Sequence, residues 1–125
     1  MNQNISNEKN IAYRVRVSTE MYDKLLKITE AMKIDLSTSV RILLVFTKRF
    51  STPHDFHEVP RTTPKNHYSV QYPAMLNVVL PQEILNWFDE VVEAEQSKRA
   101  IVFRMFVQWA MNNIGNYTIE EWIND

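Results

Sequence analysis

The amino-acid sequence predicts a mainly α-helical fold with four core helices and one two-stranded antiparallel β-ribbon. Three observations lead to this prediction. A strand, helix, helix pattern occurs twice, with the second copy displaced by 63 residues. The chain of 125 residues contains a single glycine, Gly115, which favours helices joined by simple turns over a β-rich fold. Its hydrophobic content of 45% and charged content of 23% are typical of a globular domain.

The first copy spans residues 11–50 and begins with a strand. Apolar and polar residues alternate over residues 12–17, so we expect one face to be buried and the other to be exposed. The face that we expect to be buried carries Tyr13, Val15 and Val17. The face that we expect to be exposed carries Ala12, Arg14 and Arg16.

Two amphipathic helices follow in this first copy. The first is predicted over about residues 19–33, with Ser18 or Thr19 as its N-cap. The second ends near Phe50, and either Asp35 or Ser37 could cap its start. The apolar residues of the first helix recur at spacings of three and four, and we expect these side chains to enter the core: Met21, Leu25, Ile28 and Met32.

The second copy spans residues 74–113 and repeats the same order. Its strand is more apolar than the first and turns Met75, Asn77 and Val79 outward. A helix is predicted from Gln82 to about Glu95, and Ser97 is predicted to cap a further helix over about residues 98–113. The residues of that last helix that we expect to face the core are Ile101, Val102, Met105, Phe106 and Trp109.

Three further segments complete the chain. Residues 1–10 are polar and are expected to form a flexible arm. Residues 51–73 contain four prolines and no apolar periodicity, so we expect a linker that crosses the domain. Residues 114–125 are expected to form an acidic C-terminal segment. The two copies are expected to fold as one domain.

The linker also contains the only histidines of the chain. His54, His57 and His67 lie near Asp55 and Glu58, and these are residue types that bind zinc. Because a proline-rich linker does not hold such ligands in a fixed geometry, we expect no metal site.

The composition excludes several classes of function. Without a glycine-rich loop the chain has no means of cradling a nucleotide phosphate chain. No set of serine, histidine and carboxylate side chains lies on elements that would align a nucleophile, so we expect neither an enzyme nor a cofactor. The absence of cysteine, of a long apolar run and of a signal-peptide pattern predicts a cytoplasmic protein without a membrane partner.

Charge is distributed unevenly along the chain. Residues 1–50 carry a formal charge of +4, whereas residues 82–125 carry −5, although the whole chain carries only −1. The first part is therefore suited to face an anion, and the second part would repel one.

A unit of one strand and two helices cannot fold alone. About 40 residues bury too little apolar surface, and a single strand leaves its backbone groups without partners. Two units solve both problems if their strands pair and their helices share one core. This order of residues resembles the ribbon-helix-helix family, which includes the MetJ and Arc repressors. Two units on one chain look like the tandem arrangement of the relaxosome DNA-binding protein of F-type conjugative plasmids, a pseudo-dimer.

The resemblance implies that the ribbon enters the major groove of double-stranded DNA and that the second helix of each unit holds a phosphate with free backbone amides. The positions that would contact bases are Ala12, Arg14, Arg16, Met75, Asn77 and Val79. The positions that would contact phosphates are Ser37, Thr38, Ser39, Ser97, Lys98 and Arg99.

Arginine suits guanine and asparagine suits adenine, whereas Met75 and Val79 can only touch thymine methyl groups. We therefore expect an asymmetric reader of a non-palindromic half-site. Lys98 and Arg99 oppose the dipole at a helix start, which also favours an anionic partner. The sequence departs from the family where the first helix of each unit ends, because the family usually has glycine there and this chain has none.

The expected function is sequence-specific DNA binding, as a transcriptional regulator such as a repressor or as an accessory factor of plasmid transfer (conjugation) or maintenance. Pseudo-dimers are expected to associate along DNA, and the acidic second half to contact proteins. The alternative is a protein-binding adaptor or antitoxin-like module with a weakened DNA face. A third reading is a helical structural protein of a phage or plasmid that does not touch DNA.

Overall fold

The computed structural model describes residues 9–56 and 71–116. Within these residues the protein is mainly helical, with four α-helices and one two-stranded antiparallel sheet, as predicted. The elements follow in the order β1 (Asn10–Val17), α2 (Thr19–Met32), α3 (Leu36–Phe50), η1 (Pro53–Phe56), β2 (Ala74–Pro81), α5 (Gln82–Glu95), α6 (Arg99–Asn113) and η3 (Ile114–Asn116).

The strand, helix, helix order occurs twice with matching lengths. β1 and β2 each contain 8 residues, α2 and α5 each contain 14, and α3 and α6 each contain 15. Equivalent helices start 63 residues apart, which is the displacement that the sequence predicted. Residues 1–8 of the expected arm, most of the linker with His57 and His67, and the C-terminal segment from residue 117 fall outside the described residues. The prediction that the arm extends to residue 10 is wrong, because Asn10 begins β1 and the carbonyl oxygen of Lys9 accepts from the amide of Gln82 at 2.8 Å.

The two strands pair over their whole length, from Asn10 opposite Pro81 to Val17 opposite Ala74. Arg14 lies opposite Asn77, its own equivalent 63 residues later, so the approximate twofold relation between the units passes between these two residues. The alternation predicted for both strands is confirmed. The inward side chains that are buried are Val15, Val17, Leu76, Val78 and Leu80.

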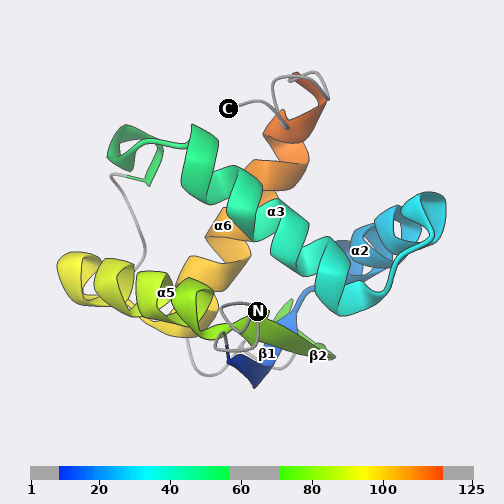
Figure 1. Cartoon of the computed structure of the whole chain (residues 1–125), viewed down its shortest axis with the longest axis horizontal. Coiled ribbons are helices and arrows are strands. Elements are labelled where there is room, and N and C mark those ends of the chain that lie inside the picture. The colour runs from blue at the N-terminus through cyan, green and yellow to red at the C-terminus, as the bar shows by residue number, and fades with distance from the viewer. Residues whose placement is uncertain (1–8, 57–70, 117–125) are drawn as a thin grey trace, which may run out of the picture.

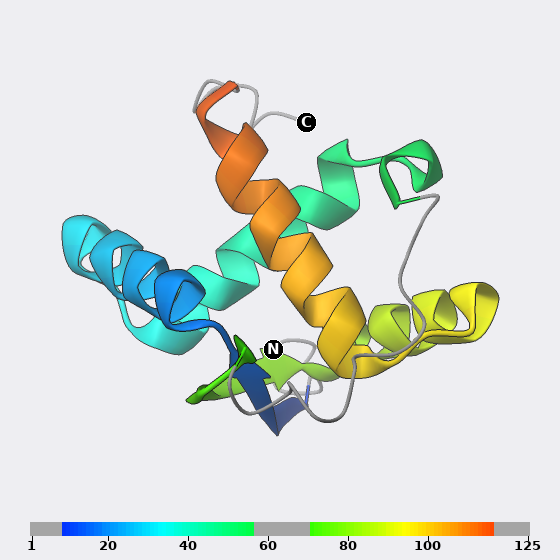
Figure 2. The same ribbon diagram turned by 180° about the vertical axis from the view of Figure 1, so that it is seen from behind.

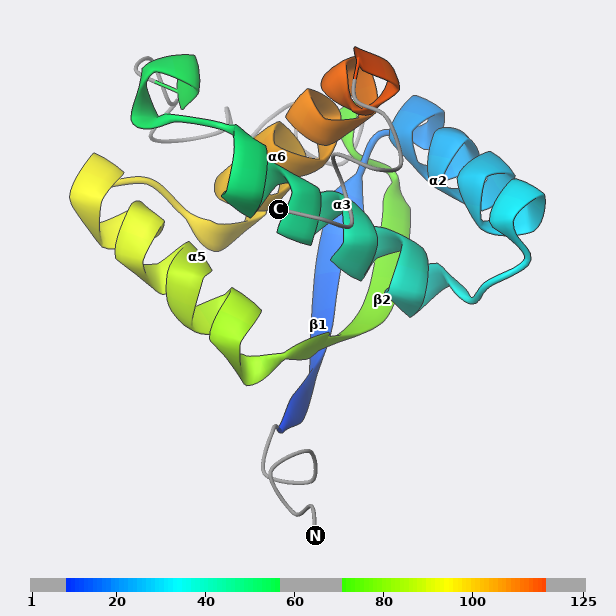
Figure 3. The same ribbon diagram turned by 45° about the horizontal axis from the view of Figure 1, so that its top comes forward.

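The helices cover one face of the ribbon and leave the other face uncovered by any described helix. α3 and α6 cross over the inner face, while α2 and α5 lie on opposite sides (Figures 1 and 3). Tyr13 reaches from the ribbon into the core, where its ring lies 6.1 Å from Phe88 and 5.6 Å from Phe103. The buried residues of both units therefore form one core among the described residues.

The crossing of α3 and α6 is held by a buried hydroxyl group. The Thr47 Oγ1 atom lies 2.8 Å from the carbonyl oxygen of Phe106 on α6 and 3.0 Å from that of Leu43 on its own helix. Thr47 and Ala110 are both fully buried at this crossing, where small side chains let the helices approach closely.

α6 buries more residues than the sequence pattern predicted. Besides the predicted Ile101, Val102 and Phe106, the helix buries Phe103, Arg104, Val107 and Ala110, while Met105 and Trp109 are only half-buried. α6 is a central helix with neighbours on several sides, so a single amphipathic stripe does not describe it. The prediction that Met32 enters the core is wrong, because it is the last residue of α2 and is 52% exposed.

The hydrogen bonds at the helix starts show which residues cap them. The Ser18 hydroxyl accepts a hydrogen bond from the amide of Met21 and caps α2. Asp35, rather than Ser37, caps α3 by accepting from the amide of Thr38 at 2.7 Å. The prediction that Ser97 caps α6 is wrong: Lys98 is the N-cap residue, and its side chain makes no capping hydrogen bond.

The first helix of each unit ends on a left-handed residue. Lys33 has a φ of 58° and Gln96 has a φ of 54°, and they occupy equivalent positions. This conformation closes each helix, since the amides of Ile34 and Ser97 then donate to carbonyl oxygens of the last turn. Glycine is usually found at this position because it adopts a positive φ without steric strain. Lys33 and Gln96 adopt the same left-handed conformation at a cost in free energy.

We therefore expect Lys33→Gly to raise the free energy of unfolding by about 0.5–1 kcal/mol. The left-handed conformation costs an ordinary residue about 1–2 kcal/mol, and the greater freedom of glycine in the unfolded chain offsets part of the gain. Urea unfolding followed by circular dichroism measures the change. Lys27→Gly, inside the same helix, is the control and should lose about 1 kcal/mol. Equal losses in both variants would contradict the account of the helix end.

Candidate nucleic-acid interface

The outer face of the ribbon carries all six residues that the sequence predicted for base contact. Ala12, Arg14 and Asn77 are exposed, and Arg16 is half-buried. Met75 and Val79 are 37% and 47% exposed, and they are two of the four large hydrophobic residues that the described part of the chain exposes. No aspartate or glutamate occurs in either strand, so the face combines cationic, amide and apolar groups.

At the centre of this face two of the predicted contact residues bond to each other. The Arg14 Nε–H group donates to the Asn77 Oδ1 atom at 3.1 Å. The bond links two exposed side chains that lie 63 residues apart in sequence and directly opposite each other in the ribbon.

Arg104 on α6 holds the end of β1 in place and was not predicted. Its guanidinium donates from Nε to the carbonyl oxygen of Arg16 at 2.9 Å and lies 3.6 Å above the ring of Tyr72. It is only 8% exposed. The sequence contains one signal for this role, because Arg104 is the one charged residue in the apolar run of residues 101–107. A cation in such a run is buried only where it has polar or charged partners.

The polar groups at the start of α3 already have hydrogen-bond partners within the protein, which limits their use as an anion site. The amides of Thr38 and Ser39, which we expected to be free, already donate to the side chain and the carbonyl oxygen of Asp35. The Ser39 hydroxyl is buried and pairs with Thr29 at 2.8 Å. The Ser37 hydroxyl accepts from the amide of Val79 at 2.8 Å, which ties the helix start to β2.

The carboxylate of Asp35 is also stabilised as an anion. Its pKa is lowered mainly by the hydrogen bond from the Thr38 amide. A negative charge at this helix start is therefore already in place, and it would oppose a phosphate at the same position.

At the start of α6 a carboxylate of the protein itself neutralises one of the two cations. Arg99 donates from two nitrogen atoms to the two oxygen atoms of Asp89 on α5, at 2.7 and 2.8 Å. This hydrogen bonding lowers the pKa of Asp89 and raises the pKa of Arg99. The position of Arg99 at a helix start predicts an external anion, whereas its anionic partner in this structure is Asp89.

The two helix starts nevertheless lie beside the ribbon. Figure 2 shows α3 and α6 beginning near the strands and running away from them. A ligand that covered the outer face of the ribbon could therefore reach both helix starts.

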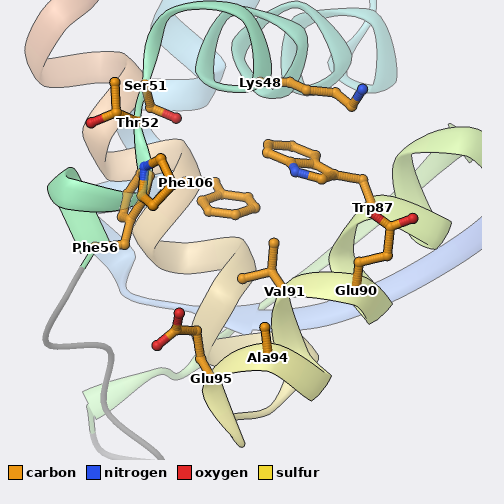
Figure 4. A pocket seen from close by; sticks show the side chains of 11 residues that line it. Lys48, Ser51, Thr52, Phe56, Trp87, Glu90, Val91, Ala94, Glu95 and Phe106 are labelled. Atoms are coloured by element: carbon orange, nitrogen blue, oxygen red, sulfur yellow. The ribbon is translucent and has the colours of Figure 1, made fainter.

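A second feature is a cleft of about 460 Å³ between α5 on one side and the end of α3 with η1 on the other (Figure 4). Trp87 and Phe106 form a stacked pair in it, with ring centroids 4.4 Å apart. The Lys48 Nζ atom lies 5.9 Å from the Trp87 ring centroid, and Glu90 and Glu95 line the side formed by α5. No local pattern in the sequence indicates this cleft, because its walls come from segments about 40 residues apart.

Among the described residues, no three histidine, aspartate or glutamate side chains gather in a way that could hold a metal ion. His54 lies in η1, whereas its neighbour Asp55 accepts hydrogen bonds from Thr52. None of the described helices is long and apolar enough to cross a membrane.

Comparison with models of protein families, with curated proteins and with solved structures found no match for this chain.

We expect Arg104→Met to destabilise the fold by about 1–3 kcal/mol, because the carbonyl oxygen of Arg16 loses its donor in a part-buried position. Arg41, the equivalent residue of the first unit, is exposed, so Arg41→Met is the matched control and should change stability by less than about 0.5 kcal/mol. Urea unfolding of both variants measures the difference. Equal stability of the two would show that Arg104 does not hold the strand.

Proposed function

We propose that this protein is a tandem ribbon-helix-helix pseudo-dimer that binds double-stranded DNA by placing its β-ribbon in the major groove. A two-stranded ribbon fits the width of that groove. The two equal units, their antiparallel strands and their shared core support the tandem arrangement.

The observation that carries the proposal is the chemistry of the outer face. Arg14, Arg16 and Asn77 project from the ribbon without an acidic neighbour in either strand. An arginine can donate two hydrogen bonds to guanine, and an amide can bond to a base edge, so the face offers base-specific contacts. Ala12, Met75 and Val79 add small or apolar surfaces that suit thymine methyl groups.

The two helix starts contribute unequally to phosphate binding. The α6 start comprises Ser97, Lys98 and Arg99. The side chain of its N-cap residue, Lys98, makes no capping hydrogen bond, so an external phosphate could accept from the amides of the first turn. The α3 start, with Ser37, Thr38 and Ser39, already holds the Asp35 carboxylate. We therefore assign the stronger phosphate contact to the second unit, with Lys98 as its main cation.

In biological terms the proposal is a DNA-binding regulator, such as a repressor, or an accessory factor of plasmid transfer or maintenance. Neighbouring pseudo-dimers would associate along the DNA, and the acidic α5 side would face proteins. α5 contains five acidic residues and no basic residue, so it would be repelled by the phosphate backbone.

The cleft beside α5 favours one other candidate, a protein-binding adaptor or antitoxin-like module on the same fold. A partly exposed tryptophan in an apolar recess is a common anchor in protein interfaces. The two functions differ in salt dependence, because each phosphate contact contributes about −0.9 to the slope of log K against log salt.

The test is fluorescence anisotropy with a labelled duplex from the region upstream of the protein's own coding sequence and with a scrambled duplex, over a salt series. We expect tight, salt-sensitive preference for the native duplex. The Arg14→Ala/Arg16→Ala double variant should lose most of this preference, since each bidentate arginine contact is worth about 1–3 kcal/mol.

The control variant is Lys24→Ala/Lys27→Ala on α2, which removes the same charge away from the ribbon and should keep the sequence preference. Circular dichroism first establishes that both variants fold. Weak, equal binding to both duplexes that the ribbon variant does not change would refute DNA reading by the ribbon and favour the adaptor.

A further inference from the structure

We propose that Arg14 and Asn77 act as one hydrogen-bond donor group at the centre of the ribbon, and that the DNA site is directional, with a guanine at its centre. This inference rests on the proposed DNA-binding function and specifies the class of sequence that the ribbon reads.

The bond between the two side chains fixes which atoms remain for DNA. The Arg14 Nε atom carries a hydrogen and can only donate, so the atom that faces it must be the amide oxygen of Asn77. The N–H groups that remain, on the two terminal nitrogens of Arg14 and on the amide nitrogen of Asn77, are all donors. The Asn77 oxygen keeps one lone pair, but the bond holds this atom toward Arg14. Neither side chain makes another polar contact within the part of the chain that the structure describes.

A surface on which donors predominate favours bases that accept. Guanine presents two acceptors side by side in the major groove, N7 and O6, whereas adenine presents the acceptor N7 beside the donor N6. An isolated asparagine reads adenine because its oxygen accepts from N6 while its nitrogen donates to N7. In this ribbon the bond from Arg14 turns the oxygen of Asn77 toward the arginine, away from the position that adenine N6 would need, so the pair fits guanine better than adenine. This replaces the expectation of one guanine contact and one separate adenine contact.

The residues on either side of the central pair make the face directional. On one side Arg16 lies opposite Met75, and on the other side Ala12 lies opposite Val79. The first of these pairs carries a cationic donor, whereas the second is entirely apolar. A guanine therefore suits the Arg16 end and a thymine methyl group suits the Val79 end. The approximate twofold axis relates Arg14 to Asn77, Arg16 to Val79 and Ala12 to Met75, and none of these pairs matches. A palindromic site would therefore satisfy only one half of the face.

The first experiment is selection of duplexes from a random library by the full chain, followed by sequencing. We expect a non-palindromic consensus with a central guanine, a further guanine on one side and thymine on the other. Replacing the central guanine by 7-deazaguanine, which lacks the N7 acceptor, should weaken binding by about tenfold, the size of one lost base contact.

The second experiment repeats the selection with single variants. In Arg14→Ala the oxygen of Asn77 is released, so the central preference should move from guanine to adenine. Arg16→Ala is the matched control: it should lose the flanking guanine and retain the central one. Asn77→Ala should weaken the central preference, since Arg14 loses the bond that orients it.

The outcomes separate this inference from the proposed function. Selection of no sequence would refute the DNA-reading function itself. A palindromic consensus, or a central adenine that persists in both the wild type and Arg14→Ala, would leave DNA reading intact and refute the paired, directional reader. Unchanged affinity for the 7-deazaguanine duplex would also refute it.

Discussion

The antiparallel pairing of β1 with β2 is the interaction on which the rest of this structure depends. In the described part of the chain each strand has the other as its only sheet partner, so neither could satisfy its backbone groups alone. The pairing joins segments from opposite halves of the sequence and brings their inward residues into one core. It also fixes the outer face, because each side chain there is paired with one from the other unit.

The two units share a backbone plan but differ in chemistry at equivalent positions. Arg104 is buried against β1, whereas its counterpart Arg41 is exposed. Asp35 caps α3, whereas the N-cap of α6 is a lysine whose side chain makes no capping bond. A homodimer would have to repeat every such feature on both sides. A single chain that contains both units does not, and the directional DNA site that we propose depends on this freedom.

Sequence periodicity predicted the strands, the helices and the outward positions of the ribbon, because these depend on neighbouring residues and on which face is apolar. It failed where distant residues meet. The bonds of Arg99 to Asp89 and of Arg14 to Asn77 depend on how helices and strands are placed, and no local pattern contains that information. The burial of Arg104 likewise follows from the central position of α6. Recognition of one internal repeat was nevertheless sufficient to predict how the strands pair.

The most direct test of the central claim is a titration of the isotopically labelled full chain with a short duplex, followed by amide and side-chain NMR signals. We expect the signals of Arg14, Asn77 and the other outward residues of β1 and β2 to shift first, with smaller changes at the starts of α3 and α6. The indole signal of Trp87 in the cleft should stay unchanged. Shifts confined to Trp87 and α5, with the ribbon unaffected, would contradict the claim that the ribbon is the DNA-binding surface.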